Sequence, residues 1–229
     1  MKKGLLLILV CVYANGNLYS QNISQLVEAV KQKMAKVHNY EAAGRLKTNV
    51  SFLKVPVSDV TVYYKEPDQV KIKSSRGVSF IPKGVMSINT GSLLEGMDYT
   101  IIDGGTELVD GIALRIARIL PNNENSEVVL STLYIDPSNL VIIKVKTTTR
   151  ENGTYELLLS YGKYSSYGLP DKLIFSFNTN DYKLPKGITL DFDNGSTTPP
   201  SSKNKARKGR AEINFTRYRI NQGLPAEVF

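Results

Sequence analysis

The sequence has one cysteine, one histidine and no tryptophan among its 229 residues. Cys11 lies in a short apolar run near the start, so the rest of the chain has neither a disulfide nor a thiolate nucleophile. His38 has no second histidine or cysteine with which to bind a metal, and no G-x-S-x-G motif supplies a serine nucleophile. These absences argue against an enzyme and against a metal or other cofactor, and they leave an apolar core as the source of stability.

The chain also lacks an apolar run of the roughly 20 residues that cross a bilayer. Its apolar run over residues 4–12 follows two lysines and precedes a polar segment that ends at Ser20. This order is typical of a secretory signal peptide, residues 1–20, with a mature chain from Gln21. We expect Cys11 to leave with the signal. The alternative, lipidation of Cys11, is disfavoured because Val10 stands where a lipoprotein signal has a small residue.

Composition and charge favour a single basic domain over residues 21–229. The 209 residues that remain (229 minus 20) and a hydrophobic share of 41% suit one large β domain with a substantial core. Removal of the two signal lysines leaves 27 cations against 21 acids, a net charge of about +6. We expect a basic exported protein to meet anionic membrane surfaces or acidic partners in preference to nucleic acid.

An amphipathic helix is predicted from Ser24 to about Val37. Apolar residues recur there at the spacing of one helical face, at Leu26, Val27, Val30, Met34 and Val37. Ser24 is the candidate N-cap, because a serine hydroxyl can accept a hydrogen bond from the first turn.

Most of the remaining sequence alternates apolar and polar residues, which predicts antiparallel strands with one apolar and one wet face. The clearest stretch, from Leu133 to Phe177, reads as several strands joined by polar turns. Further strands are expected at residues 40–53, 58–66, 69–73, 100–103, 111–120, 126–136 and 211–221, and turns at residues 103–105, 121–125, 136–139 and 151–153. Residues 79–89 look irregular, and residues 92–97 form either a short helix or a lid-like loop.

A second basic feature lies near the end of the chain. Residues 196–210 are rich in Ser, Thr, Pro and Lys, which predicts a mobile loop, and its cations are Lys203, Lys205, Arg207, Lys208 and Arg210. One interpretation is a solvated hairpin loop. The other is contact with anionic lipid headgroups or an acidic patch on a partner, at about 1 kcal/mol for each cation near such a surface. The lack of interleaved aromatic residues argues against nucleic acid.

The predicted strands carry many apolar side chains, which could line a binding site. Nine candidates for a ligand cavity stand there at period two: Tyr64, Val70, Ile72, Phe80, Leu157, Leu159, Leu173, Phe175 and Phe177. Such residues are usually ordinary core when taken one by one. However, one or two helices are too few to cover the whole apolar face of a long meander, and the uncovered part is expected to form a cavity.

Several segments together resemble the periplasmic lipoprotein-carrier family, LolA and its outer-membrane lipoprotein-sorting relatives, over residues 21–229. After the helix these are N-Y-E-A-A-G-R-L, V-Y-Y-K-E-P-D-Q-V-K-I-K, L-Y-I-D-P-S-N-L-V-I-I-K-V and Y-G-K-Y-S-S-Y-G-L-P-D-K-L. The resemblance implies an α+β, mainly β fold: an open half barrel of strongly curved antiparallel sheet, whose concave apolar side is lidded by helices and holds acyl chains. In the carrier, a basic residue helps to control the lid. That residue stands immediately before the proline that follows the early strand, whereas Glu66 precedes Pro67 here.

The resemblance implies a chaperone of outer-membrane biogenesis: an exported, monomeric periplasmic carrier that moves lipoproteins or lipids between membranes, with inner- and outer-membrane receptor proteins as partners. Each buried methylene would contribute about 0.8 kcal/mol to binding, and release would need a lid movement or a receptor of greater affinity. The alternative is a sensor or scaffold that detects lipid or mislocalised lipoprotein with the same half barrel and regulates a protein partner.

Overall fold

The computed structural model describes residues 22–49, 56–67, 69–75, 98–151, 153–178 and 208–229. These residues form one α-helix, one short 3-10 helix and ten strands. In chain order the elements are α1 (Ile23–Met34), β1 (Asn39–Asn49), β2 (Ser58–Lys65), β3 (Gln69–Ser74), β4 (Tyr99–Val109), β5 (Ile112–Pro121), β6 (Val128–Asp136), β7 (Val141–Thr149), β8 (Thr154–Ser160), η2 (Ser165–Tyr167), β9 (Lys172–Asn178) and β10 (Lys208–Ile220).

Helix α1 begins one residue earlier and ends three residues earlier than the periodicity predicts. The N-cap is Asn22 and not Ser24, because the Asn22 side chain accepts a hydrogen bond of 3.0 Å from the Ser24 backbone N–H. Ala35 caps the other end. The apolar stripe packs into the core as expected, through Ile23, Leu26, Val27, Val30 and Met34.

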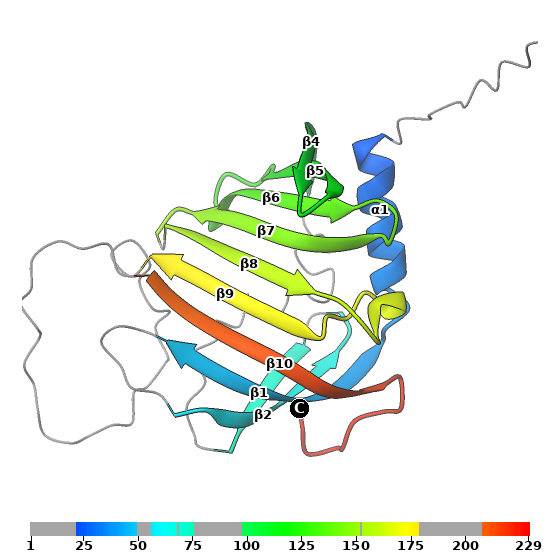
Figure 1. Cartoon of the computed structure of the whole chain (residues 1–229), viewed down its shortest axis with the longest axis vertical. Coiled ribbons are helices and arrows are strands. Elements are labelled where there is room, and N and C mark those ends of the chain that lie inside the picture. The colour runs from blue at the N-terminus through cyan, green and yellow to red at the C-terminus, as the bar shows by residue number, and fades with distance from the viewer. Residues whose placement is uncertain (1–21, 50–55, 68, 76–97, 152, 179–207) are drawn as a thin grey trace, which may run out of the picture.

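The ten strands form one antiparallel sheet in the order β3-β2-β1-β10-β9-β8-β7-β6-β5-β4. Strands β4 to β9 follow one another as a meander, and the last strand, β10, lies in the middle of the sheet between β1 and β9. Among the described strands the sheet does not close, since β3 and β4 form its two edges. Figure 1 shows the curved sheet with α1 standing against one end of it.

The two faces of this sheet differ in burial along almost every strand. In β1, for example, Tyr40, Ala42 and Leu46 are buried, whereas Arg45 and Lys47 between them and beyond are exposed. The buried residues of the strands join those of α1 in one core cluster. We call the face toward α1 the inner face and the opposite one the outer face.

The turn predicted at residues 103–105 is wrong, because β4 continues through it to Val109. The register with β5 shifts between Asp103 and Thr106, which identifies a β-bulge, and Gly105 there has a φ of +83°. The Asp103 carboxylate accepts a hydrogen bond of 2.8 Å from the Gly105 N–H. The chain reverses instead at Asp110 and Gly111, both at positive φ.

The turn expected at residues 136–139 is present. The Asp136 carboxylate accepts hydrogen bonds from the backbone N–H of Ser138 and Asn139 at 2.9 and 3.2 Å. The loop predicted at residues 196–210 extends too far, because its last three residues, from Lys208 on, already belong to β10. Residues 196–207, 79–89 and 92–97 and the predicted signal peptide lie outside the described residues.

Candidate functional site: the two faces of the sheet

Eight of the nine cavity candidates lie on the inner face, and the ninth, Phe80, lies outside the described residues. Six of them belong to the core cluster and are at most 5% exposed: Tyr64, Leu157, Leu159, Leu173, Phe175 and Phe177. The other two, Val70 and Ile72, are half-buried and pack against that cluster. The inner face is therefore packed in this structure, and which of its residues would surround a ligand stays a prediction.

Strand register brings these candidates together from two parts of the chain that are far apart in sequence. On β8 and β9, Leu157 pairs with Phe175 and Leu159 with Leu173. On β2 and β3, Tyr64 pairs with Val70. Strands β1 and β10 join the two groups, because they carry buried apolar residues of their own on the same face. The result is one continuous apolar surface across the middle of the sheet.

This surface carries no charged side chain on the inner face of seven strands, β1–β3 and β7–β10, as far as the described residues extend. Its polar groups are hydroxyls, such as the buried Thr147, which lies 3.0 Å from the hydroxyl of Ser131 on β6. The first inner-face charges appear toward β4, where Arg115 pairs with Asp103 at 2.8 Å. An uncharged concave face suits an apolar ligand, because burial of an unpaired charge is costly.

Aromatic rings that the sequence analysis did not single out extend the inner face near the end of α1. Tyr40 packs against Tyr64 and Tyr218 with ring centroids 5.4 and 5.5 Å apart, and Tyr164 lies 4.9 Å from Tyr218. Burial raises the pKa of the Tyr218 hydroxyl, which donates a 2.7 Å hydrogen bond to the Pro170 carbonyl. The available signal for Tyr40 was period two, since Tyr40 starts a run of alternating buried residues in β1.

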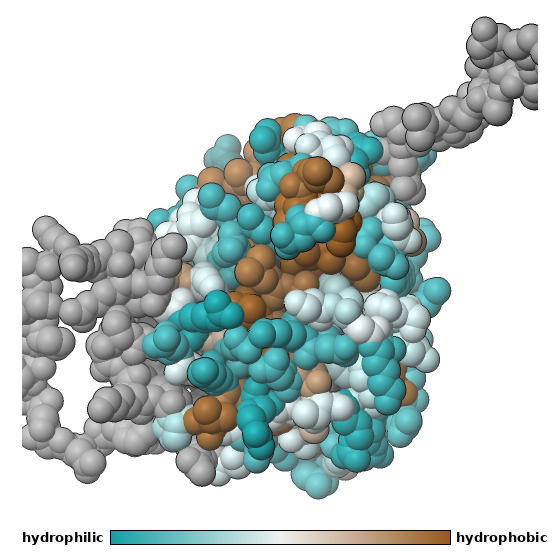
Figure 2. Space-filling view, viewed as in Figure 1, coloured by the Kyte–Doolittle hydropathy of each residue, from teal (hydrophilic) through white to brown (hydrophobic). Residues whose placement is uncertain are grey.

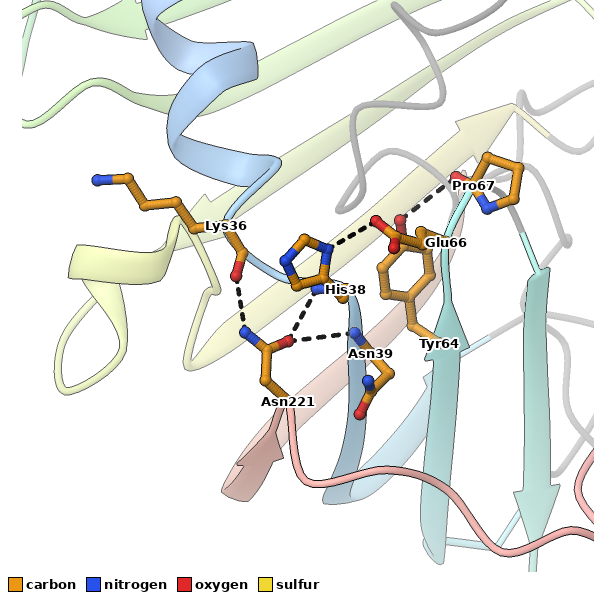
Figure 3. A network of polar contacts seen from close by, with 7 residues as sticks. All are labelled: Lys36, His38, Asn39, Tyr64, Glu66, Pro67 and Asn221. Atoms are coloured by element: carbon orange, nitrogen blue, oxygen red, sulfur yellow. Dashed lines mark hydrogen bonds and ion pairs between the residues drawn. The ribbon is translucent and has the colours of Figure 1, made fainter.

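At the same end of the sheet, Glu66 pairs with the chain's only histidine (Figure 3). The His38 Nδ1 atom lies 2.8 Å from the Glu66 carboxylate, and both side chains are more than half exposed. Asn221 supports His38 from the other side, because its side-chain oxygen accepts a 2.8 Å hydrogen bond from the His38 backbone N–H and its amide donates to the Lys36 carbonyl at 2.7 Å. Where the family resemblance implies a basic residue, a carboxylate thus faces an imidazole that follows α1.

The outer face has its own polar site. Lys47, Asn49, Arg210 and Glu212 line a shallow pocket of about 280 Å³ on β1 and β10. The Glu212 carboxylate accepts hydrogen bonds from Lys172, Arg210 and Asn214 at 2.9, 3.0 and 3.1 Å. The Lys172 bond and then the Asn214 bond lower the pKa of Glu212 to about 2, so this carboxylate is ionised at any physiological pH.

The basic loop candidates are only partly placed. Lys203, Lys205 and Arg207 lie outside the described residues. Lys208 begins β10, and Arg210 is exposed on the outer face beside Glu212. In the part of the chain that the structure describes, no group of three His, Cys, Asp or Glu side chains could hold a metal ion. Within the same residues, no helix is long and apolar enough to cross a membrane.

No protein-family model matches the sequence, and no curated protein matches it. Solved structures do match the fold. A LolA superfamily protein from Nitrosomonas europaea is 11% identical, aligns over 90% of this chain and 96% of its own, and has a TM-score of 0.53. A DUF1329 family protein from Desulfovibrio piger is 12% identical over 89% of this chain and 95% of its own, with a TM-score of 0.52.

At this level of identity the comparisons show the fold. The chain has the open, mainly β half-barrel architecture of a LolA superfamily protein, as the sequence resemblance implies. One helix, α1, covers part of the inner face in the described residues, so the expected combination of curved antiparallel sheet and inner helical cover is confirmed.

Proposed function

We propose that this protein is an exported, periplasmic carrier that binds acyl chains of lipoproteins or lipids against the inner face of its sheet and moves them between membranes in outer-membrane lipoprotein sorting. One observation carries the proposal: seven strands of a curved sheet present an inner face without any described charge. Acyl chains offer nothing but apolar area, so a face of this chemistry binds them without leaving a polar group unpaired.

Binding requires the packed inner face to open. Leu157 and Phe175 are fully buried, so an acyl chain that enters must replace contacts that the core already makes. The element able to move is α1, which packs at the end of the sheet against β4, β5 and η2. A chain of ten buried methylenes would contribute about 8 kcal/mol, which is enough to offset separation of the helix from part of the sheet.

The attachments of α1 suit a helix that shifts without unfolding. At its C-terminal end the Lys33 ammonium donates a 2.6 Å hydrogen bond to the Asn139 carbonyl, and Asn221 fixes Lys36 just beyond it. At the other end, the only capping bond of the described residues is local, from the Ser24 N–H to Asn22. We therefore expect the Ile23 end of α1 to move away from the sheet when an acyl chain enters, and release to follow the reverse movement or capture by a membrane receptor.

The test is the location of a photoreactive fatty acid on the delipidated protein, read by mass spectrometry. We expect cross-links at inner-face residues such as Tyr64 and Leu157, and none at their outer-face neighbours Tyr63 and Glu156. Cross-links confined to the outer face, or no recoverable bound lipid at all, would contradict the proposal.

A matched pair of substitutions on β2 separates filling of the inner face from general damage. Val62→Phe places extra volume on the inner face, and Thr61→Phe places the same ring on the outer face. We expect Val62→Phe to weaken fatty-acid binding at least tenfold at a stability cost of about 1 to 3 kcal/mol, and Thr61→Phe to leave binding unchanged. Transfer of the bound lipid to acceptor vesicles identifies a carrier. Binding without transfer, together with a stable protein complex, identifies the sensor.

A further inference from the structure

The outer face of the sheet is strongly cationic. On strands β1–β3 and β7–β10 it carries eleven lysines and arginines against four acids, an excess of seven positive charges without Lys208. The cations are Arg45, Lys47, Lys65, Lys71, Lys73, Lys144, Lys146, Lys172, Arg210, Arg217 and Arg219, and the acids are Glu41, Asp59, Glu156 and Glu212. The rest of the chain carries 18 cations (29 minus 11) and 17 acids (21 minus 4). The excess on this one face therefore accounts for almost all of the net charge of +8.

Ion pairs on this face use all four acids but only part of the cations. Arg45, Lys144, Lys172, Arg210 and Arg219 each lie within 4 Å of one of the acids. Six further cations form no ion pair with any described residue, and all are exposed: Lys47, Lys65, Lys71, Lys73, Lys146 and Arg217. Among the described residues, these six charges have no acid of the chain as a partner.

A row of four apolar or aromatic residues and three charged residues crosses the same face. Register partners follow one another from β5 to β1 in the order Ile116, Tyr134, Lys144, Leu158, Ile174, Glu212 and Lys47, and we call this set the outer row. Leu158 and Ile174 are half-buried, not buried, and Lys144 lies over the Tyr134 ring at 4.5 Å. Figure 2 shows apolar surface that runs from the β4–β5 end of the sheet down to about β8, with mainly hydrophilic surface below it.

We propose that the outer face docks on an anionic lipid surface, with its unpaired cations at the headgroups and the apolar part of the outer row in the interfacial region. A band of apolar residues flanked by lysines and arginines is the composition that lies in a membrane interface. The outer row spans seven strands, about 29 Å at the usual strand spacing, and ends in the pocket that Lys47 and Arg210 line together with Asn49 and the Glu212 carboxylate.

Charge and shape favour a lipid surface over other occupants. A second copy of the chain would bring a face of the same sign and would be repelled. An acidic helix needs a groove, whereas the cations here are distributed over six of the seven strands, and the pocket on this face measures only about 280 Å³. A fluid anionic surface has spread charge that matches this distribution. Docking uses the outer face and acyl-chain binding the inner face, so different variants test the two proposals.

The test is co-sedimentation of the purified protein with vesicles of phosphatidylcholine alone or with one third phosphatidylglycerol. We expect binding to the anionic vesicles only, and loss of binding as salt shortens the Debye length from about 10 to about 3 Å. Lys47→Gln with Lys146→Gln should weaken the partition coefficient about twenty-five-fold, because each cation near the surface contributes a factor of about five.

The matched control removes the same charge elsewhere. Lys36 and Lys163 are exposed cations in the connections after α1 and after β8, and Lys36→Gln with Lys163→Gln should weaken binding less than threefold. Leu158→Thr with Ile174→Thr should weaken binding about tenfold with the salt dependence retained. Circular dichroism establishes that each variant is folded, and if the Lys47 and Lys146 double variant is not, Lys146→Gln alone should give about a fivefold loss.

Three outcomes would overturn the proposal. The protein does not bind anionic vesicles, it binds neutral vesicles equally well, or the control pair weakens binding as much as the outer-face pair. In the last case the net charge of the chain, and not this face, would be responsible. Retention of an acidic protein without any binding to anionic vesicles would place a protein partner on the face instead.

Discussion

The inner and outer faces of the sheet are made by alternate residues of the same strands, yet they have opposite chemistry. On β8, Leu157 and Leu159 are buried on the inner face, while Glu156 and Leu158 are half-buried on the outer face. On β10 the inner residues are apolar and the outer ones are mostly charged. Because side chains alternate at every residue, a slip of one position in any strand would exchange the two surfaces.

A bulge in β10 preserves this division where the simple alternation fails. In β10, Phe215 and Tyr218 are both buried although they are three residues apart. The register with β1 shifts between Ala43 and Gly44, and Thr216 is the extra residue, whose hydroxyl donates to the Ala43 carbonyl at 3.1 Å. A Cβ atom at Gly44 would lie 2.9 Å from the Asn214 carbonyl oxygen, so the close approach of the two strands requires glycine there.

The largest expected contrast between the faces comes from one carboxylate placed at two neighbouring positions. Leu159→Glu buries a charge at a site that is 4% exposed, and we expect it to lower the free energy of unfolding by about 5 kcal/mol or more. Leu158→Glu faces Lys144 in the register on the half-buried outer side, and we expect a change within about 1 kcal/mol. Urea unfolding followed by circular dichroism measures both.

Equal losses at Leu158 and Leu159 would contradict the division into two faces. The comparison holds even if Leu159→Glu does not fold, because Leu158→Glu must then still unfold cooperatively at a urea concentration close to that of the parent. Leu159→Met serves as the control for shape, with an expected loss below about 1.5 kcal/mol.

Local alternation was sufficient to predict most strands and the composition of the inner face. Each of the described cavity candidates lies on the inner side, because period two in the sequence translates directly into one face of a strand. The outer row was not predicted. Its members, from Ile116 to Lys47, come from seven strands, and only the pairing of those strands brings them into line.

The position of β10 and the bulge in β4 show the same limit. A tail that alternates predicts a strand but not its neighbours, and β10 pairs with β9, which precedes it, and with β1 near the start of the described residues. The Asp103-Gly104-Gly105 sequence is typical of a turn, but Gly104 packs so closely on Ile116 that the strand continues with one extra residue. Contacts between strands, and not the local sequence pattern, decided both features.

A smaller contrast is expected from removal of side-chain volume at adjacent positions of β9. Phe175 is fully buried and packs against the rings of Phe177 and Tyr155, with centroids 5.1 and 5.6 Å apart. We expect Phe175→Ala to cost about 3 to 5 kcal/mol through the cavity that it leaves. Ile174→Ala on the outer face should cost about 1 kcal/mol. Equal midpoints in urea for the two variants would mean that Ile174 belongs to a second core.

The smallest contrast concerns charge on the outer face and depends on pH. The pKa of Glu212 is lowered to about 2 from an ordinary value of 4.5, first by the Lys172 hydrogen bond. Because the pKa is lower in the folded state, the ionised carboxylate stabilises the fold fully above about pH 4.5, and this contribution is lost as the pH falls toward 2. At neutral pH we expect Glu212→Gln to lower the free energy of unfolding by about 1 to 2 kcal/mol, since the amide keeps part of the hydrogen bonding.

The difference between Glu212→Gln and the parent should therefore shrink between about pH 4.5 and pH 2 and disappear below it, as measured by urea unfolding across that range. Glu156→Gln is the control, because Glu156 meets Lys144 at 3.6 Å on a more exposed part of the same face and should cost less than about 0.5 kcal/mol. A Glu212→Gln difference that stays constant with pH would show that this carboxylate acts through packing and not through its charge, and the outer face would then owe its ordering to the apolar residues of the outer row.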